Sequence, residues 1–187
     1  PNTEWEDLTV SHTAFNSLMA SSSEHYYSFF NELKQWAGDK DRNIKLRDKQ
    51  GYEKVLKVYT ELNENDFDPI EIYAYFIGLY INNMHNGIYL DYVLSFPVTY
   101  EKVIRDKILE SFRKGLKKSL PETLVNNDEV MSRFRVQAGA SEPAAYAICA
   151  LEEYNFELKP DEKIFYGVFD FGGGTTDFDF GVWREST

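Results

Sequence analysis

A run of three glycines, Gly172 to Gly174, separates two segments of strong β propensity. The first segment extends from Lys163 to Phe171 and the second from Thr175 to Trp183, and both are rich in aromatic residues. Two such segments joined by a short glycine-rich connection are typical of a β-hairpin. This feature constrains the fold most, because it defines two neighbouring strands before any other element is assigned.

Helical and strand-like segments alternate upstream of the hairpin. Apolar residues at three- and four-residue intervals, or capping residues, predict helices over 22–37, 69–85, 99–121 and 141–154. Shorter apolar runs predict strands over 55–59, 89–96 and 134–138, and the polar stretch 122–132 is expected to be a loop. This order of strands and helices is typical of an α/β fold.

Two of the helix starts carry specific signals. Asp68 is an N-cap acceptor, Pro69 suits the first helical position, and Glu71 can reach back to the cap. Thr99 is expected to cap the next helix. The apolar residues predicted on its inner face are Val103, Ile104, Ile108, Phe112 and Leu116.

The first ninety residues are more irregular than the rest of the chain. We therefore expect a boundary near Tyr89, which divides the sequence into residues 1–88 and residues 89–187. Both ends of the sequence are expected to be cut from a longer protein, because the first residue is Pro1 and an apolar alternating run, 178–183, ends shortly before the last residue.

Composition excludes several classes of function. The formal net charge is -11, from 20 basic and 31 acidic residues, which disfavours nucleic-acid binding driven by Lys and Arg. The single cysteine, Cys149, cannot form an internal disulfide, and its apolar surroundings predict a buried thiol. The longest apolar stretch, 70–81, is too short to span a bilayer, so we expect a cytoplasmic protein without a membrane partner.

The glycine run could also bind phosphate. Glycines allow successive backbone N–H groups to approach an anion, and Asp170 lies at the end of the preceding strand. Thr175 could donate its hydroxyl to the same phosphate, and Asp170 and Asp177 could hold Mg²⁺ through its water shell. The simpler alternative is a plain hairpin turn flanked by two turn-forming aspartates.

Four segments together resemble one family, the nucleotide-binding domain of the seventy-kilodalton heat-shock chaperones, which are actin-like ATPases. Residues 169–177 are similar to the family's second phosphate motif, and residues 139–147 resemble its Asn-Glu-Pro-Thr-Ala-Ala-Ala segment. Residues 93–97, followed by Arg105, resemble its strand, proline and downstream arginine, and residues 33–38 resemble its Lys-Arg-Leu-Ile-Gly segment. The four segments occur in the family's order.

The resemblance implies a fragment of the actin-like ATPase, or ribonuclease H-like, fold, with a mixed sheet and flanking helices. Residues 1–88 would form the peripheral subdomain of the first lobe, and residues 89–187 would complete the core of that lobe and begin the second. ATP or ADP with Mg²⁺ would be the ligands of the full-length protein. Client polypeptides or co-chaperones would be its protein partners.

The resemblance also assigns roles to individual residues. Lys34 would lie near the γ-phosphate and orient the attacking water. Glu142 and Asp170 would bind the water shell of magnesium, and Asp177 would help to position metal or water. Pro97 and Pro143 would act as switch prolines that relay the nucleotide state, with Arg105 on the path to a partner. The cofactor-binding residues would be Gly172, Gly173, Gly174, Thr175 and Thr176.

The sequence departs from the family in several places. The first phosphate motif and the adenosine-binding segment are absent, so this chain alone is expected to bind ATP poorly. Ser141 replaces the usual Asn before Glu142, and residues 120–133 are expected to be an insertion. Two alternatives remain open: an actin-fold protein-interaction module without ATP turnover, and a small-molecule kinase or filament-forming member of the same superfamily.

Overall fold

The computed structural model describes residues 4, 7–84, 87–159, 161–172 and 176–184. The helices are α1 (Ser11–Ala20), α2 (Leu33–Gly38), α3 (Pro69–Met84), α4 (Lys102–Lys118), α5 (Glu122–Val125), α6 (Asp128–Met131) and α7 (Glu142–Glu153), with 3₁₀ turns at Ser23–Ser28 and Tyr59–Glu61. The strands are β1 (Ile44–Arg47), β2 (Glu53–Leu56), β3 (Asp91–Phe96), β4 (Arg135–Ser141), β5 (Ile164–Phe171) and β6 (Thr176–Trp183). The α/β class predicted from the sequence is confirmed.

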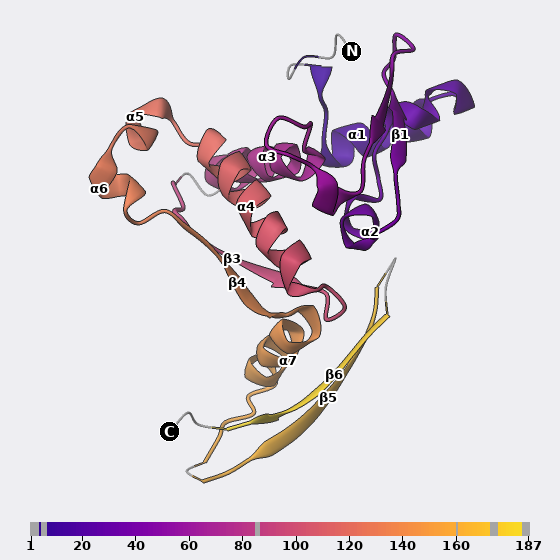
Figure 1. The fold of residues 1–187 in the computed structure, drawn as a ribbon. Coiled ribbons are helices and arrows are strands. Elements are labelled where there is room, and N and C mark those ends of the chain that lie inside the picture. Colours follow the sequence, from indigo (N-terminus) through magenta and orange to yellow (C-terminus); the bar gives the residue numbers. More distant parts are fainter. Residues whose placement is uncertain (1–3, 5–6, 85–86, 160, 173–175, 185–187) are drawn as a thin grey trace.

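The described strands form three two-stranded sheets instead of the expected single mixed sheet. β1 and β2 are antiparallel, β3 and β4 are parallel and are connected through α4, and β5 and β6 form the antiparallel hairpin. Helix α7 contacts β4 on one side and the β5–β6 hairpin on the other (Figure 1). The helix thus lies between the two pairs of strands.

The main core lies between α2, the first turn of α3 and α4. Trp36 and Tyr59 are completely buried there, with ring centroids 5.3 Å apart, and the Trp36 indole nitrogen donates to the carbonyl oxygen of Lys57 at 3.2 Å. Ile70 and Ile104 belong to the same cluster. The core therefore joins residues from both sides of the boundary expected near Tyr89, and the division into subdomains stays a prediction.

Helices α3 and α4 approach each other closely because glycines lie at their contacts. A Cβ atom on Gly115 would lie 2.2 Å from the carbonyl oxygen of Glu71 and 2.7 Å from the Cβ of Ala74. A Cβ atom on Gly78 would lie 2.1 Å from the hydroxyl oxygen of Ser119. Larger side chains at these two positions would push the helices apart.

The α3 start is confirmed, and a buried hydrogen-bond network extends from it. Asp68 Oδ1 accepts from the backbone N–H groups of Ile70, at 2.8 Å, and Glu71. Its other oxygen accepts from the Ser111 hydroxyl at 2.5 Å, and that hydroxyl contacts the Tyr59 hydroxyl at 2.8 Å. Asp68 thus caps one helix and links it to the side chains of two other elements.

Four predictions about local structure were wrong. The strand expected over 55–59 ends at Leu56, and Tyr59 begins a 3₁₀ turn. The helix expected over 22–37 is interrupted, because the chain is extended at Phe29 and the Phe30 ring packs edge-on against Trp36, with centroids 5.5 Å apart. The expected loop over 122–132 contains α5 and α6, and Asn127 caps α6 by accepting from the backbone N–H of Val130. Helix α4 begins after Glu101 instead of Thr99, and its Val103 is 66% exposed.

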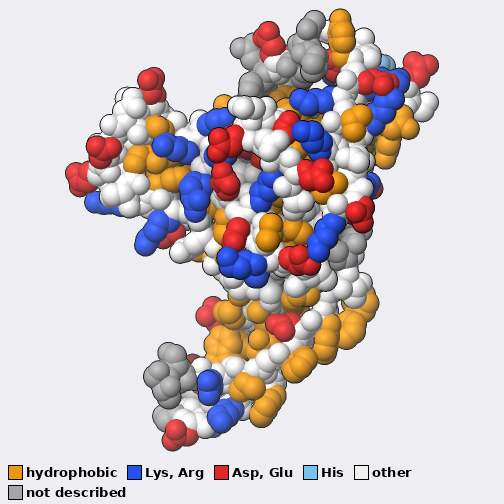
Figure 2. Space-filling view, in the orientation of Figure 1, with side chains coloured by type: hydrophobic (Ala, Val, Ile, Leu, Met, Phe, Trp, Pro, Cys, Tyr) orange, Lys and Arg blue, Asp and Glu red, His pale blue; other side chains and the backbone are white. Residues whose placement is uncertain are grey.

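The β5–β6 hairpin has two different faces. Val168, Asp170 and their same-face partners on β6, Asp177 and Asp179, lie on the face against α7, where Val168 is buried. The opposite face carries an apolar row in which each phenylalanine is more than half exposed. This phenylalanine face consists of Phe165, Phe169, Phe171, Phe178, Phe180 and Val182. Figure 2 shows an apolar band along this part of the molecule.

Candidate functional site

The start of α7 places the Glu-Pro segment in a defined local structure. Ser141 is the N-cap residue, and its hydroxyl accepts from the backbone N–H of Ala144 at 3.4 Å. Ser141 therefore supplies a cap in place of the Asn of the segment that residues 139–147 resemble. Glu142 occupies the first turn, where the helix dipole favours a negative charge, and Pro143 is fully buried.

An ion pair joins two of the residues assigned from separate segments. Lys34 Nζ lies 2.8 Å from Glu142 Oε2, which connects the first turn of α2 to the first turn of α7. The two side chains are 42% and 27% exposed, so solvent still reaches the pair. An ammonium group and a carboxylate that remain accessible to solvent are suited to binding a further charged group.

Tyr100 fixes the position of α2 in this arrangement. Its hydroxyl donates to the carbonyl oxygen of Lys34 at 2.5 Å, and a Cβ atom on Gly38 would lie 2.7 Å from its ring. Burial raises the pKa of Tyr100 to about 12, and the nearby Glu142 charge acts in the same direction. Sequence analysis missed this residue. The signal that could have indicated Tyr100 is the turn that begins at Pro97. The Pro97 carbonyl oxygen accepts from the Tyr100 N–H in this turn, at 3.2 Å.

The two aspartates that flank the glycine run lie opposite each other. Asp170 on β5 pairs in register with Asp177 on β6, so their Cβ atoms are about 5 Å apart. Asp177 is only 4% exposed, and Asp179 lies on the same face two residues further along β6. Several carboxylates thus lie on the side of the hairpin that packs on α7.

The carboxylate oxygens of Asp170, Asp177 and Glu142 are the donor type that Mg²⁺ prefers. Magnesium usually keeps several waters and needs only one or two protein carboxylates, so this donor set fits the ion. No group of three or more His, Cys, Asp or Glu side chains close enough to hold a metal occurs in the part of the chain that the structure describes.

The remaining predicted site residues lie in several different elements. Gly172 and Thr176 are exposed at the ends of β5 and β6, whereas Gly173, Gly174 and Thr175 lie outside the described residues. Pro97 is buried at the end of β3. Arg105 lies on the exposed side of α4, where no described carboxylate is within ion-pair distance.

The prediction for Cys149 was wrong, because this thiol is exposed on α7. The α7 residues that pack inward are Pro143, Ala147 and Leu151, which recur at a spacing of four residues. Cys149 is two residues from both Ala147 and Leu151, which places it on the opposite side of the helix. Its apolar neighbours Tyr146 and Ile148 are exposed as well. An apolar run on a short helix therefore did not indicate burial of all its members.

Comparison with known proteins found no protein-family model that matches the chain and no curated protein that is significantly similar to it. Among the described residues, no helix combines the length and apolar character needed to cross a membrane. The family resemblance therefore rests on the sequence segments that carry it.

Proposed function

We propose that this chain is part of an ATP-binding and ATP-hydrolysing domain similar to the nucleotide-binding domain of the seventy-kilodalton heat-shock chaperones. The observation that carries this proposal is the contact between Lys34 and Glu142, which are 108 residues apart in the sequence. The resemblance assigned the first to the γ-phosphate and the second to the water shell of the metal. Such residues must be neighbours in any working site of this kind.

The pairing of Asp170 with Asp177 supports the same proposal. Two carboxylates directly opposite each other on a hairpin repel, and this arrangement is stabilised when a cation lies near both. The ends of β5 and β6 at the glycine run extend in the direction of α2 in the view of Figure 1.

In this proposal each group has a distinct role. Lys34 would neutralise charge on the terminal phosphate and orient the attacking water, while Glu142 would hold the lysine ammonium in place and contact the water shell of Mg²⁺. Asp170 and Asp177 would also hold the water shell of Mg²⁺, which would offset phosphate charge when bound. Tyr100 positions Lys34 through the backbone of α2.

The proposal is tested by isothermal titration calorimetry of the full-length protein with ATP and with ADP. We expect binding of both nucleotides in the presence of Mg²⁺ and much weaker binding after the metal is chelated. Release of inorganic phosphate from ATP would establish hydrolysis in the same preparation. An absence of magnesium-dependent affinity for either nucleotide would refute the enzymatic proposal.

The phenylalanine face favours a second candidate function, a protein-interaction module without turnover. Soluble proteins rarely expose apolar patches of this extent unless a partner covers them. The two functions are distinguished by phosphate release, because an interaction module could bind nucleotide and still release no phosphate. Substitution of Lys34 would then leave partner binding unchanged.

A further inference from the structure

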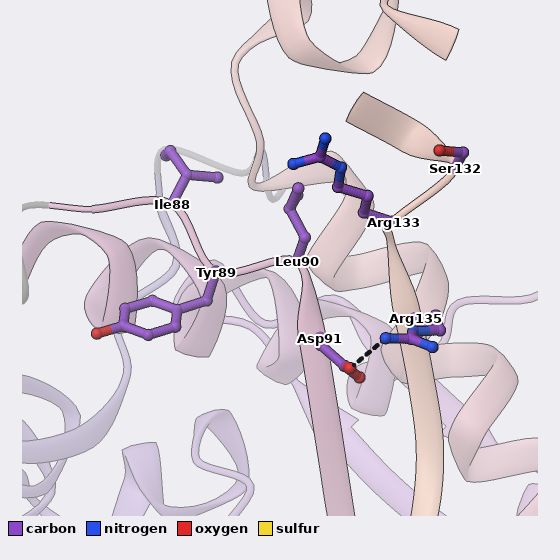
Figure 3. Close-up of a pocket in the computed structure, with 7 residues that line it drawn as sticks. All are labelled: Ile88, Tyr89, Leu90, Asp91, Ser132, Arg133 and Arg135. Carbon is purple, nitrogen blue, oxygen red and sulfur yellow. Dashed lines mark hydrogen bonds and ion pairs between the residues drawn. The ribbon is translucent and has the colours of Figure 1, made fainter. Parts of the chain in front are cut away.

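An open hollow lies at the end of the β3–β4 pair, away from the Lys34–Glu142 contact. Its volume is about 520 Å³, and the short segment before β3 and the turn before β4 form its walls. Figure 3 shows the residues that line it, with the Arg133 side chain extending over Leu90 toward Ile88. We call this site the arginine hollow, defined by Ile88, Tyr89, Leu90, Asp91, Ser132, Arg133 and Arg135.

The two arginines are held on this side by the residue between them. Phe134 packs inward near Tyr92, with ring centroids 6.5 Å apart, and lies against the smaller core cluster. Arg135, the next residue and the first of β4, projects to the opposite side. Arg133 reaches the same hollow from the turn before β4. Backbone hydrogen bonds fix the turn itself, because the Arg133 N–H donates to Val130 at 3.0 Å and the Arg135 N–H donates to Leu90 at 2.7 Å.

Both arginines retain capacity for a further anion. Arg135 Nη2 donates to Asp91 Oδ2 at 2.8 Å, which uses one of the five N–H donors of its guanidinium group. Arg133 lies 3.7 Å from Glu129, and these two side chains are 73% and 85% exposed. An ion pair this long and this exposed contributes little to stability. Another carboxylate can therefore replace Glu129 as the partner of Arg133.

Apolar side chains beside the arginines restrict the kinds of ligand that fit the hollow. Ile88 is 44% exposed, and Leu90 lies partly exposed next to it. The hollow is larger than a single small anion requires and is open to solvent, so it would cover only one side of a ligand. Protein interfaces commonly combine arginine with apolar side chains in this way.

We propose that the arginine hollow docks a segment of a partner protein in which an acidic side chain is flanked by apolar residues. The acidic side chain contacts Arg133 and Arg135, and its apolar neighbours contact Ile88 and Leu90. Charge complementarity supports this occupant, because the guanidinium groups of Arg133 and Arg135 both line the hollow. This inference is independent of nucleotide binding.

The probe is a short fluorescein-labelled peptide of alternating leucine and glutamate, with a leucine–glutamine peptide of equal length as its counterpart. Fluorescence anisotropy with the intact protein should show binding of the glutamate peptide that weakens as salt is raised, and little binding of the glutamine peptide. Arg133→Glu should weaken binding about tenfold or more. Arg47→Glu on β1 has the same change in charge and should leave affinity unchanged.

Ile88→Asn provides a second variant that removes an apolar wall without changing charge, and it should weaken binding as well. Circular dichroism of each variant checks that it is folded. Equal binding of the two peptides, or equal weakening by Arg133→Glu and Arg47→Glu, would overturn the proposal. Displacement of the peptide by an equal concentration of free succinate would indicate a small-anion site. That result would contradict the proposal that a protein segment binds there.

Discussion

Lys34 on α2 and Glu142 on α7 form an ion pair with an N–O distance of 2.8 Å across a sequence separation of 108 residues. Because both side chains are partly exposed, the pair contributes about 1 kcal/mol or less to folding. A large functional effect of either substitution would therefore point to the chemistry of the site. Stability and activity can be measured separately on the same variants.

Lys34→Ala should reduce phosphate release from ATP by about 100-fold in the full-length protein, because a charge-stabilising donor at the terminal phosphate is lost. The melting temperature should change little. Lys40→Ala is the control, since Lys40 forms a more exposed ion pair with Glu101 at 2.5 Å. Equal activity of the two variants would contradict the role of Lys34.

Asp170→Asn should have opposite effects on stability and on ligand binding. Removal of one charge from the Asp170–Asp177 pair should stabilise the metal-free protein by up to about 1 kcal/mol, because like charges opposite each other on a hairpin repel. The same substitution should reduce the effect of Mg²⁺ on ADP affinity, measured by calorimetry. Asp106→Asn on α4 serves as the control, and loss of stability in Asp170→Asn would contradict this account.

Much of the fold could be predicted because its signals are local. The Asp68-Pro69 start of α3, the Ser141 cap of α7 and the hairpin strands all depend on residues close together in the sequence. The interruption at Phe29 could not be predicted, because Phe30 is drawn toward Trp36 by tertiary packing that overrides helical periodicity. Short helices such as α5 and α6 likewise lack the length that a periodic pattern requires.

The candidate site was predictable in its residues and only partly in its geometry. Resemblance named Lys34 and Glu142, but no pattern in the sequence indicated that they are in contact. Tyr100 was missed because its role depends on a single long-range hydrogen bond to the Lys34 carbonyl. Contacts between distant segments follow from packing, which periodicity and capping do not specify.

Gly115→Ala should destabilise the protein by about 1–3 kcal/mol, because the added methyl group would overlap the backbone of Glu71 on α3. The small gain in helix propensity from alanine would not offset this clash. Urea denaturation followed by circular dichroism measures the change. Gly167→Ala is the matched control, since a Cβ atom there has no neighbour within 4 Å. Equal stability of the two variants would refute the close approach of α3 and α4.

Stability should fall at alkaline pH through Tyr100. The pKa of Tyr100 is raised to about 12 in the folded state, whereas an unfolded tyrosine ionises near pH 10. Above about pH 10 the unfolded chain binds fewer protons than the folded one, so the free energy of unfolding decreases until the folded tyrosine also ionises. Tyr59 acts in the same direction, because burial raises its pKa too.

Tyr100→Phe should therefore flatten the pH dependence of the free energy of unfolding between about pH 10 and 12. Urea denaturation at several pH values measures this slope in both proteins. Tyr154→Phe is the control, because Tyr154 is 75% exposed. An unchanged slope in Tyr100→Phe would show that this hydroxyl ionises alike in both states.

The hairpin carries carboxylates on one face and phenylalanines on the other, and strand alternation alone separates them. A slip of β6 by one residue against β5 would turn Asp177 and Asp179 out to water and direct Phe178 and Phe180 toward α7. The length of the connection after Phe171 thus determines which chemistry each side displays. Adding or deleting one glycine there would exchange the acidic and the apolar side chains of β6 between the two faces without altering any other residue.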